Sequence, residues 1–228
     1  MKLTPERLIR AYSAGAFPMA EARSSAEVAF YQPVKRGVFD LRHIHIPRRL
    51  RRWMARTPHR YRIDCDFAQV IAHCAQAPRS QTQGTWINGE IERAFCELHQ
   101  CGLAHCLSAH GPSGELLGGV YGLHLGQIFF GESMFAKATN ASKGCLIALF
   151  ACLAAAGFRW IDAQLPNRHL AQFGLQTWAN EDFLAQLPGL LDGPALAFPR
   201  RVTRQQISQF LEGQFLEGQF LQSTTHTS

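Results

Sequence analysis

The sequence predicts an α+β protein with a small basic N-terminal domain and a larger C-terminal domain. Hydrophobic residues make up 46% of the 228 positions and charged residues 18%, which is typical of a globular protein. Apolar residues recur at helical spacing in some segments and alternate in others. Several strand patterns come first, and a helix–strand–helix pattern follows them. This order favours segregated antiparallel strands and helices over a strictly alternating α/β fold.

The N-terminal part, residues 1–62, begins with a well-marked helix. Thr4 is placed as its N-cap, Pro5 as its first residue and Gly15 as its stop. β-Branched and aromatic residues broken by prolines and glycines predict short strands within residues 28–47. A basic helix is expected over residues 48–55, before Pro58.

The C-terminal part, residues 63–228, carries the remaining elements. Helices are expected over residues 67–77, 88–101 and 142–156, with a further helix starting at residue 169. Strands are expected over residues 105–110, 116–123, 127–132 and 158–164. A five-residue repeat in residues 210–222 fits neither a solenoid nor a coiled coil, so we give it little functional weight.

Charge is distributed unevenly along the chain. Residues 1–62 contain 14 Lys and Arg against 4 Asp and Glu, whereas the rest of the chain has a net charge of −4. The densest basic cluster, residues 48–62, also contains Trp53 and Tyr61. Basic residues mixed with aromatic ones favour nucleic-acid binding over a merely solvated basic face. The candidate contacts are Arg48, Arg49, Arg51 and Arg52.

Seven cysteines and the N-terminal pattern indicate the cellular setting. The first residues lack the apolar core of a signal peptide, and no apolar run approaches a membrane span, so we expect a cytoplasmic protein without a membrane partner. We therefore expect reduced thiols and no metal. The alternative is a metal site, because cysteine and histidine mix, without a C-x-x-C pair, at Cys96, His99, Cys101, His105, Cys106 and His110.

Seven short motifs then occur in a specific order and spacing. They are AYSAGAFPM (11–19), GTWI (84–87), GGVYG (118–122), FGESMF (130–135), NASK (140–143), DAQ (162–164) and HLAQFG (169–174). In this combination the chain resembles the leucyl/phenylalanyl-tRNA–protein transferases over roughly residues 3–175.

The resemblance implies a C-terminal domain like the acetyltransferase (GNAT) fold and a transfer reaction. Leucine, phenylalanine or methionine would pass from its tRNA to a protein that begins with Arg or Lys, which marks that protein for degradation. The partners would be aminoacyl-tRNA and such acceptor proteins. Aminolysis of a reactive ester needs positioning and charge stabilisation, not a cofactor.

Three polar residues are the candidate catalytic groups. Asp162 and Gln164 lie two apart on a predicted strand, so both side chains are expected on one face, open to the cleft. Glu132 follows an apolar strand and needs a polar partner there. The alternative is that these residues only brace the strands.

A pocket for Leu, Phe or Met needs apolar walls, and the 3′ adenosine needs polar contacts. Apart from the resemblance, each apolar candidate could equally be ordinary core, and Ser142 could simply be the N-cap of the following helix. The substrate-binding candidates are Met19, Trp86, Val120, Phe129, Met134, Leu149, Asn140 and Ser142.

Two rival functions remain open at this point. An acyl-coenzyme A-dependent acyltransferase of the same fold would need a glycine-rich pyrophosphate loop before a helix, and residues 138–143 contain no glycine. A non-catalytic RNA-binding module would explain the basic end but not the acidic C-terminal motifs.

Overall fold

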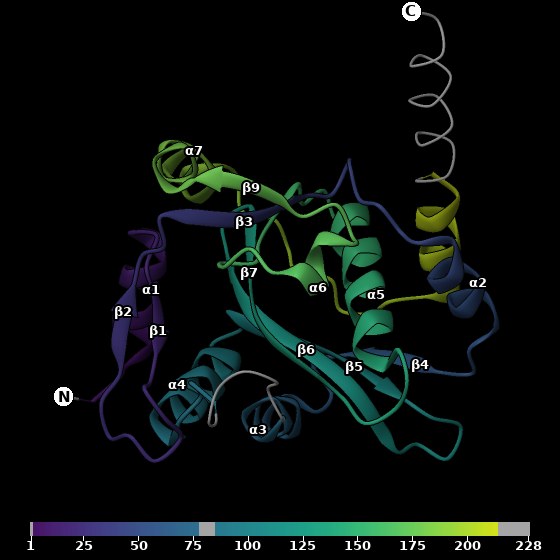
Figure 1. Cartoon of the computed structure of the whole chain (residues 1–228), viewed down its shortest axis with the longest axis horizontal. Helices are drawn as coiled ribbons and strands as arrows, with labels where there is room; N and C mark the ends of the chain where they lie inside the picture. Colours follow the sequence, from purple (N-terminus) through teal and green to yellow (C-terminus); the bar gives the residue numbers. More distant parts are fainter. Residues whose placement is uncertain (1, 78–84, 214–228) are drawn as a thin grey trace, which may run out of the picture.

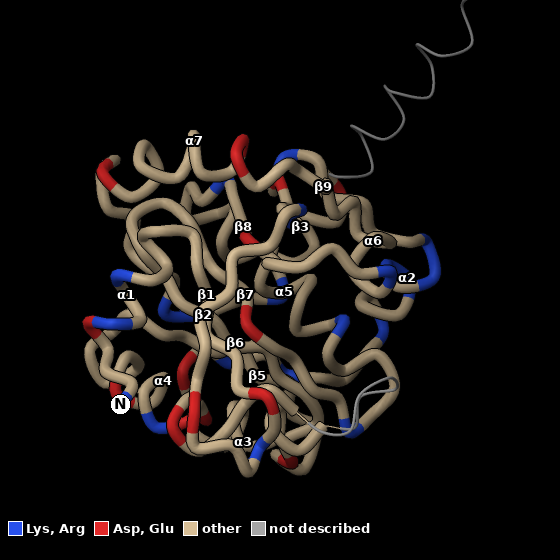
Figure 2. Tube along the Cα trace, turned by 60° about the vertical axis from the view of Figure 1, so that its left-hand side comes forward, with Lys and Arg blue, Asp and Glu red and all other residues tan. Residues whose placement is uncertain are grey.

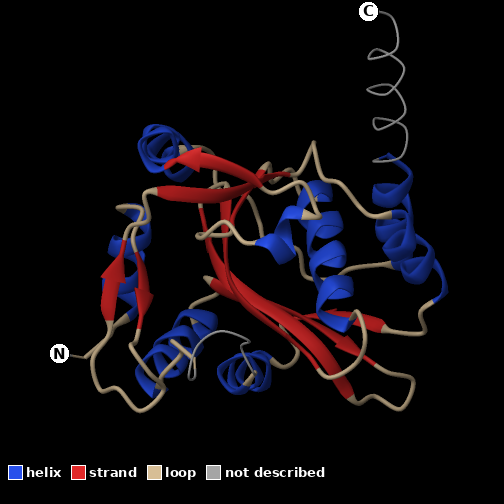
Figure 3. Cartoon of the chain, viewed as in Figure 1, coloured by secondary structure: helices blue, strands red, loops and turns tan. Residues whose placement is uncertain are grey.

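The computed structural model describes residues 2–77 and 85–213, and its centre is one seven-stranded mixed sheet (Figures 1 and 3). The strand order is β4-β5-β6-β7-β8-β3-β9, and a separate two-stranded sheet joins β1 to β2. Within the large sheet β7 and β8 run parallel, while every other neighbouring pair runs antiparallel. The predicted mixture of helices and strands is therefore confirmed as a mixed architecture around a central sheet.

The elements follow the sequence patterns closely in most places. Their bounds in chain order are α1 (Pro5–Ser13), β1 (Phe17–Met19), β2 (Ala29–Tyr31), β3 (Lys35–Asp40), α2 (Arg48–Arg56), β4 (Arg60–Ile63), α3 (Phe67–Gln76), α4 (Gly89–Gln100), β5 (Ala104–His110), β6 (Leu116–Leu125), β7 (Ile128–Ala136), α5 (Ala141–Ala155), β8 (Trp160–Asp162), α6 (Arg168–Ala171), β9 (Gln176–Ala179) and α7 (Asn180–Asp192). A helix over residues 204–213, the C-terminal helix, follows.

Helices cover both faces of the sheet and divide the core into two clusters. Helix α5 packs on β5, β6 and β7 from one face, and its buried side chains join those of α2 and the C-terminal helix. Helices α3 and α4 cover the other face, and their core also takes side chains of α1 and α7. Figure 1 shows α5 and α3 on opposite sides of β5 and β6.

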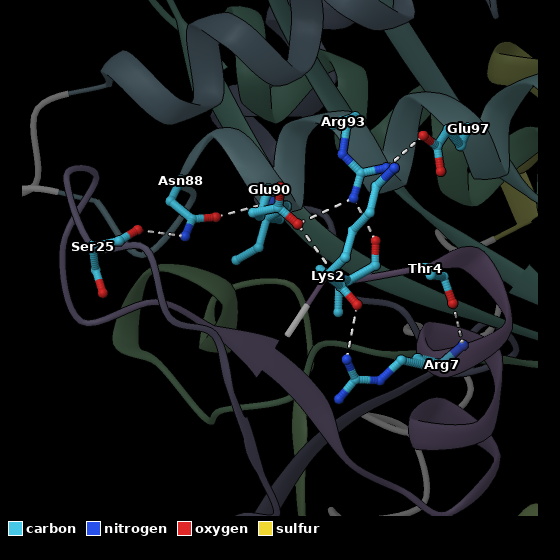
Figure 4. A network of polar contacts seen from close by, with 10 residues as sticks. Lys2, Thr4, Arg7, Ser25, Asn88, Glu90, Arg93 and Glu97 are labelled. Carbon is cyan, nitrogen blue, oxygen red and sulfur yellow. Dashed lines mark hydrogen bonds and ion pairs between the residues drawn. The ribbon is translucent and has the colours of Figure 1, made fainter.

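The start of the chain is fixed to α4 by polar contacts (Figure 4). Arg93 donates a hydrogen bond to the carbonyl oxygen of Leu3 and forms ion pairs with Glu90 and Glu97. Glu90 in turn accepts a hydrogen bond from the backbone NH of Leu3 at 3.1 Å. These contacts hold the start of the chain, and with it α1, against α4; Tyr12 of α1 is fully buried.

Several sequence expectations need correction. The expected strand over residues 158–164 is confined to Trp160–Asp162, and the strand expected over residues 127–132 continues to Ala136. Ser142 is not a cap, because α5 begins at Ala141 and its N-cap is Asn140 in the left-handed conformation. The prediction has no counterpart for β4, β9, α7 or the helix over residues 204–213.

The division of the chain near residue 62 remains a prediction. Strands β3 and β4 precede that position, and they pair with strands that follow it. Most of the repeat in residues 210–222 lies outside the described residues, as does Gly84 of the GTWI motif.

Candidate active site

The candidate site lies where the parallel strands β7 and β8 separate. Their pairing ends at Phe130 opposite Asp162, after which β8 stops and β7 continues. Glu132 therefore lies on one side of the opening and Gln164 on the other. The amide nitrogen of Gln164 donates a hydrogen bond to Oε1 of Glu132 at 2.5 Å and closes the gap between them.

A β-bulge sets the direction of Glu132. Tyr121 and Gly122 are consecutive on β6, yet they pair with Ser133 and Gly131, so Glu132 is the extra residue on β7. A bulge turns its extra side chain out of the regular pleat. Gly122 is needed opposite it, because a Cβ there would lie 2.2 Å from the carbonyl oxygen of Phe130.

Glu132 is a buried carboxyl group with a strongly perturbed pKa. Burial raises its pKa to about 8, the nearby charge of Asp162 adds to this, and hydrogen bonds from Tyr12 and Gln164 oppose it. The hydroxyl of Tyr12 donates to Oε1 at 2.6 Å. Oε2 has no hydrogen-bond partner among the described residues. A buried polar atom without a partner is costly, which makes Oε2 a natural contact for a substrate.

Asp162 does not face the cleft, which corrects the sequence expectation. Its side chain is fully buried and forms a two-point ion pair with Arg36, whose Nε and Nη2 donate at 2.9 and 2.5 Å. Arg36 is also fully buried, donates to the carbonyl oxygen of Gly15 and lies over the ring of Phe183. The arginine neutralises the carboxylate, so Asp162 offers no free charge to the cavity.

Asp162 instead fixes the conformation of Gln164. Its Oδ1 accepts a hydrogen bond from the backbone NH of Gln164 at 2.8 Å. Gln164 lies beyond the end of β8 and has a φ of 61°, an unusual value for a residue other than glycine. Strand alternation therefore does not orient the two side chains. The turn does so, and it directs the Gln164 amide towards Glu132.

A cavity of about 690 Å³ opens beside Glu132. Its apolar walls include Val120, Met134 and Leu149, three of the residues predicted to bind the amino-acid side chain. Its polar rim includes Asn167, Arg168 and His169, which the sequence reasoning did not assign although His169 begins the HLAQFG motif.

The structure does not bring the other predicted binding residues into that lining. Phe129 is fully buried in the α5-side core, while Met19 and Trp86 pack against the core on the opposite face of the sheet. Asn140 and Ser142 lie at the start of α5 and are also absent from the lining. Their proposed roles in substrate binding remain predictions.

The four predicted RNA-binding arginines all lie on α2. Arg48, Arg49 and Arg52 are exposed, and Arg51 is partly buried. Figure 2 shows α2 as a basic segment at the edge of the molecule. Among the described residues, none of the predicted cysteine and histidine positions forms a group that could hold a metal ion. No described helix is long and apolar enough to span a membrane.

Sequence comparisons agree with the motifs around this site. The family profile for the leucyl/phenylalanyl-tRNA protein transferase matches residues 38–188, and the profile for its N-terminal domain matches residues 1–33. The chain belongs to the leucyl/phenylalanyl-tRNA–protein transferase family. It is accordingly a transferase.

Curated relatives with this family name cover most of the chain. A transferase from Dinoroseobacter shibae is 43% identical over 85% of this chain and 84% of its own length. One from Pseudomonas putida is 41% identical over 84% and 83%, and one from Ruegeria pomeroyi is 43% identical over 86% and 90%. A solved structure, L-PGS from Bacillus licheniformis, aligns with 78% of this chain and 64% of its own at 12% identity and a TM-score of 0.43.

Besides the three polar rim residues, sequence reasoning missed Tyr12 and Arg36, which contact Glu132 and Asp162. Tyr12 lies in the AYSAGAFPM motif, so a signal for it was present, but nothing in the sequence links it to Glu132, 120 residues away. Arg36 is one of many basic residues near the N-terminus. Only the pairing of β3 with β8 reveals that it neutralises Asp162.

Proposed function

We propose that this leucyl/phenylalanyl-tRNA–protein transferase moves leucine, phenylalanine or methionine from tRNA to the N-terminal Arg or Lys of an acceptor protein. The observation that carries the proposal is the cavity between β7 and α5, which has apolar walls and is lined at its polar end by Glu132. Gln164 holds that carboxyl group through a hydrogen bond. Apolar walls suit these three side chains, while the polar end suits the ester and the amine that reacts with it.

The reaction forms a C–N bond between the acceptor's amine and the ester carbonyl carbon, and it breaks the bond to the 3′ oxygen of the tRNA. The proton lost by the amine balances the proton gained by that oxygen. Gln164 would donate a hydrogen bond to the substrate or to Glu132 and hold the carboxyl group in place. Asp162 and Arg36 would position Gln164 without contacting substrate.

Glu132 would contact the acceptor's amine through Oε2. In the free enzyme its pKa of about 8 leaves the carboxyl group largely protonated at neutral pH. A cationic acceptor in the cavity would favour the carboxylate and lower this pKa. Acceptor binding would then release a proton from Glu132 and create the charge that holds the acceptor.

The arginines of α2 would bind the phosphates of the tRNA.

A GNAT-like fold is also part of this proposal. The parallel pair β7–β8 within an otherwise antiparallel sheet supports that fold assignment.

A transfer assay tests the proposal. Purified protein with labelled leucyl-tRNA should label a peptide that begins with Arg or Lys and leave a peptide that begins with Glu unlabelled. Equal labelling of both peptides would contradict the acceptor assignment. If no leucine is transferred and the protein instead acylates the peptide from acyl-coenzyme A, the donor is acyl-coenzyme A and not aminoacyl-tRNA.

A further inference from the structure

A second groove lies between α2 and the C-terminal helix, and the proposed transfer site does not use it. Its volume is about 490 Å³. One side is formed by α2 and the start of β4, and the other by the C-terminal helix, which Figure 1 shows beside α2. The lining residues include Ala55, His59 and Tyr61 on the first side and Arg204 and Ser208 on the second.

Packing fixes the C-terminal helix against α2. Ile207 and Leu211 are 6% and 7% exposed and join the core cluster that contains Leu50 and Met54 of α2. Nη2 of Arg204 also donates a hydrogen bond to the carbonyl oxygen of Thr57 at 2.9 Å. The groove is therefore a built feature of the fold.

Both sides of the groove carry positive charge. Arg48, Arg51 and Arg52 share a side of α2 with Ala55, because these positions follow the i, i+3, i+4, i+7 spacing of one helix face. On the other side Arg204 lines the groove, and Arg200 and Arg201 precede it in the chain; all three side chains are exposed. Residues 194–211 contain no Asp or Glu. Glu212 follows directly on the C-terminal helix and accepts a hydrogen bond from the hydroxyl of the lining residue Ser208 at 3.2 Å, so one carboxylate lies at this end of the groove.

Aromatic rings line the floor between these charges. Tyr61 and His59 contribute to the lining, and the ring of His59 lies edge-on to that of Trp53 with centroids 5.2 Å apart. Burial lowers the pKa of His59, and the nearby negative charge of Glu115 opposes this shift. A positively charged groove with aromatic platforms is the arrangement that binds single-stranded nucleic acid. An acidic peptide would use the arginines but not the rings.

We propose that the C-terminal segment, which lies beyond the family-matched residues 38–188, forms one RNA-binding surface together with α2. Arg200, Arg201 and Arg204 would contact phosphates, and the groove takes an unpaired nucleotide of the tRNA between Tyr61 and Ser208. The proposal rests on the proposed tRNA substrate and extends its binding site to a part of the chain that the family match does not include.

Binding of deacylated leucine tRNA to the full-length protein tests this surface. The triple variant Arg200→Gln, Arg201→Gln and Arg204→Gln should bind about tenfold more weakly at 0.15 M salt. Its plot of log binding constant against log salt should be shallower by about 2, because three single-stranded phosphate contacts each contribute about 0.7 to the slope. A variant that changes only Arg200 and Arg201 keeps the contact of Arg204 with Thr57 and should show an intermediate effect.

A matched control removes the same charge elsewhere. Lys2, Arg10 and Lys35 are exposed and lie outside α2 and the C-terminal segment, so changing all three to Gln should leave the slope nearly unaltered. Ser208→Trp fills the groove without changing charge. It should weaken binding about fivefold and leave the salt slope unchanged.

The outcomes separate this inference from the proposed function. Suppose that wild type binds tRNA, that replacement of Arg48, Arg49, Arg51 and Arg52 abolishes this binding, and that the C-terminal variants bind tRNA normally. The arginines of α2 then act alone and the inference is wrong. The inference is also wrong if the C-terminal variants lose only binding of poly-glutamate, the acidic-peptide probe. Failure of wild type to bind tRNA at all would overturn the proposed function itself.

Discussion

Replacing Asp162 by Asn tests the central feature of the site, a buried ion pair next to the turn that positions the side-chain amide of Gln164. The change keeps the shape of the side chain and removes its charge. Arg36 would then be fully buried without a counterion, although it would keep its hydrogen bond to Gly15 and its contact with Phe183. Breaking one side of a buried ion pair costs about 3–5 kcal/mol.

That loss is a large fraction of the free energy of unfolding of a typical domain, which is about 5–15 kcal/mol. For a chain of this size, it corresponds to a fall in Tm of roughly 6–20 °C. Urea and thermal unfolding would measure it. The sequence alone predicted little effect on folding, because it placed Asp162 on an open face.

Activity should fall as well, for a separate reason. The backbone NH of Gln164 would lose its charged acceptor, and the left-handed turn that directs the amide towards Glu132 would relax. At a temperature where the variant is folded, we expect kcat/KM for leucyl transfer to fall at least about tenfold, which is roughly 1.4 kcal/mol of transition-state stabilisation.

The double variant Asp162→Asn with Arg36→Met separates stability from positioning. Removing both charges should restore much of the lost stability, because the buried pair is replaced as a unit. The turn at Gln164 would still lack its carboxylate, so activity should stay low. A single Asp162→Asn variant that unfolds like wild type would refute the buried pair, and full activity in the folded variant would refute the positioning role.

Three further predictions concern the surroundings of this pair. Because the pKa of Glu132 is raised on folding, its contribution to stability is present below about pH 4.5 and is lost as pH rises towards about 8. In urea titrations, Glu132→Gln should therefore gain stability relative to wild type across this window, by up to about 1.4 kcal/mol per pH unit. A stability difference between the two proteins that is the same at pH 5 and pH 8 would contradict the raised pKa. Met134→Ala should lower kcat/KM for leucyl transfer about tenfold, whereas Met19→Ala should not, because Met134 lines the cavity and Met19 does not. Equal losses in the two variants would show that this cavity is not the amino-acid pocket. Gly122→Ala should reduce stability by about 1–3 kcal/mol and also impair transfer, because its Cβ would displace the bulge that holds Glu132, while Gly89→Ala, which meets nothing within 4 Å, should be tolerated in both assays.

The sequence by itself determined the local elements and the family. The predicted N-cap Thr4 located α1, and helical periodicity located α4 to within about a residue at each end, because such signals act over only a few residues. The motif order identified the transferase family, since it depends on residue identity and spacing alone. Glu132 and Gln164 were also recognised as candidates, and the structure places their side chains in contact.

Tertiary structure alone decided how the site is assembled. Strand alternation placed Asp162 beside Gln164 on an open face, but pairing of β3 with β8 buries Asp162 against Arg36, and β8 ends before Gln164. The bulge at Glu132 depends on the register between β6 and β7, which local propensity does not specify. The contact of Tyr12 with Glu132 joins segments 120 residues apart. Such contacts follow from long-range packing, so only the folded chain reveals which carboxyl group is neutralised and which remains available to a substrate.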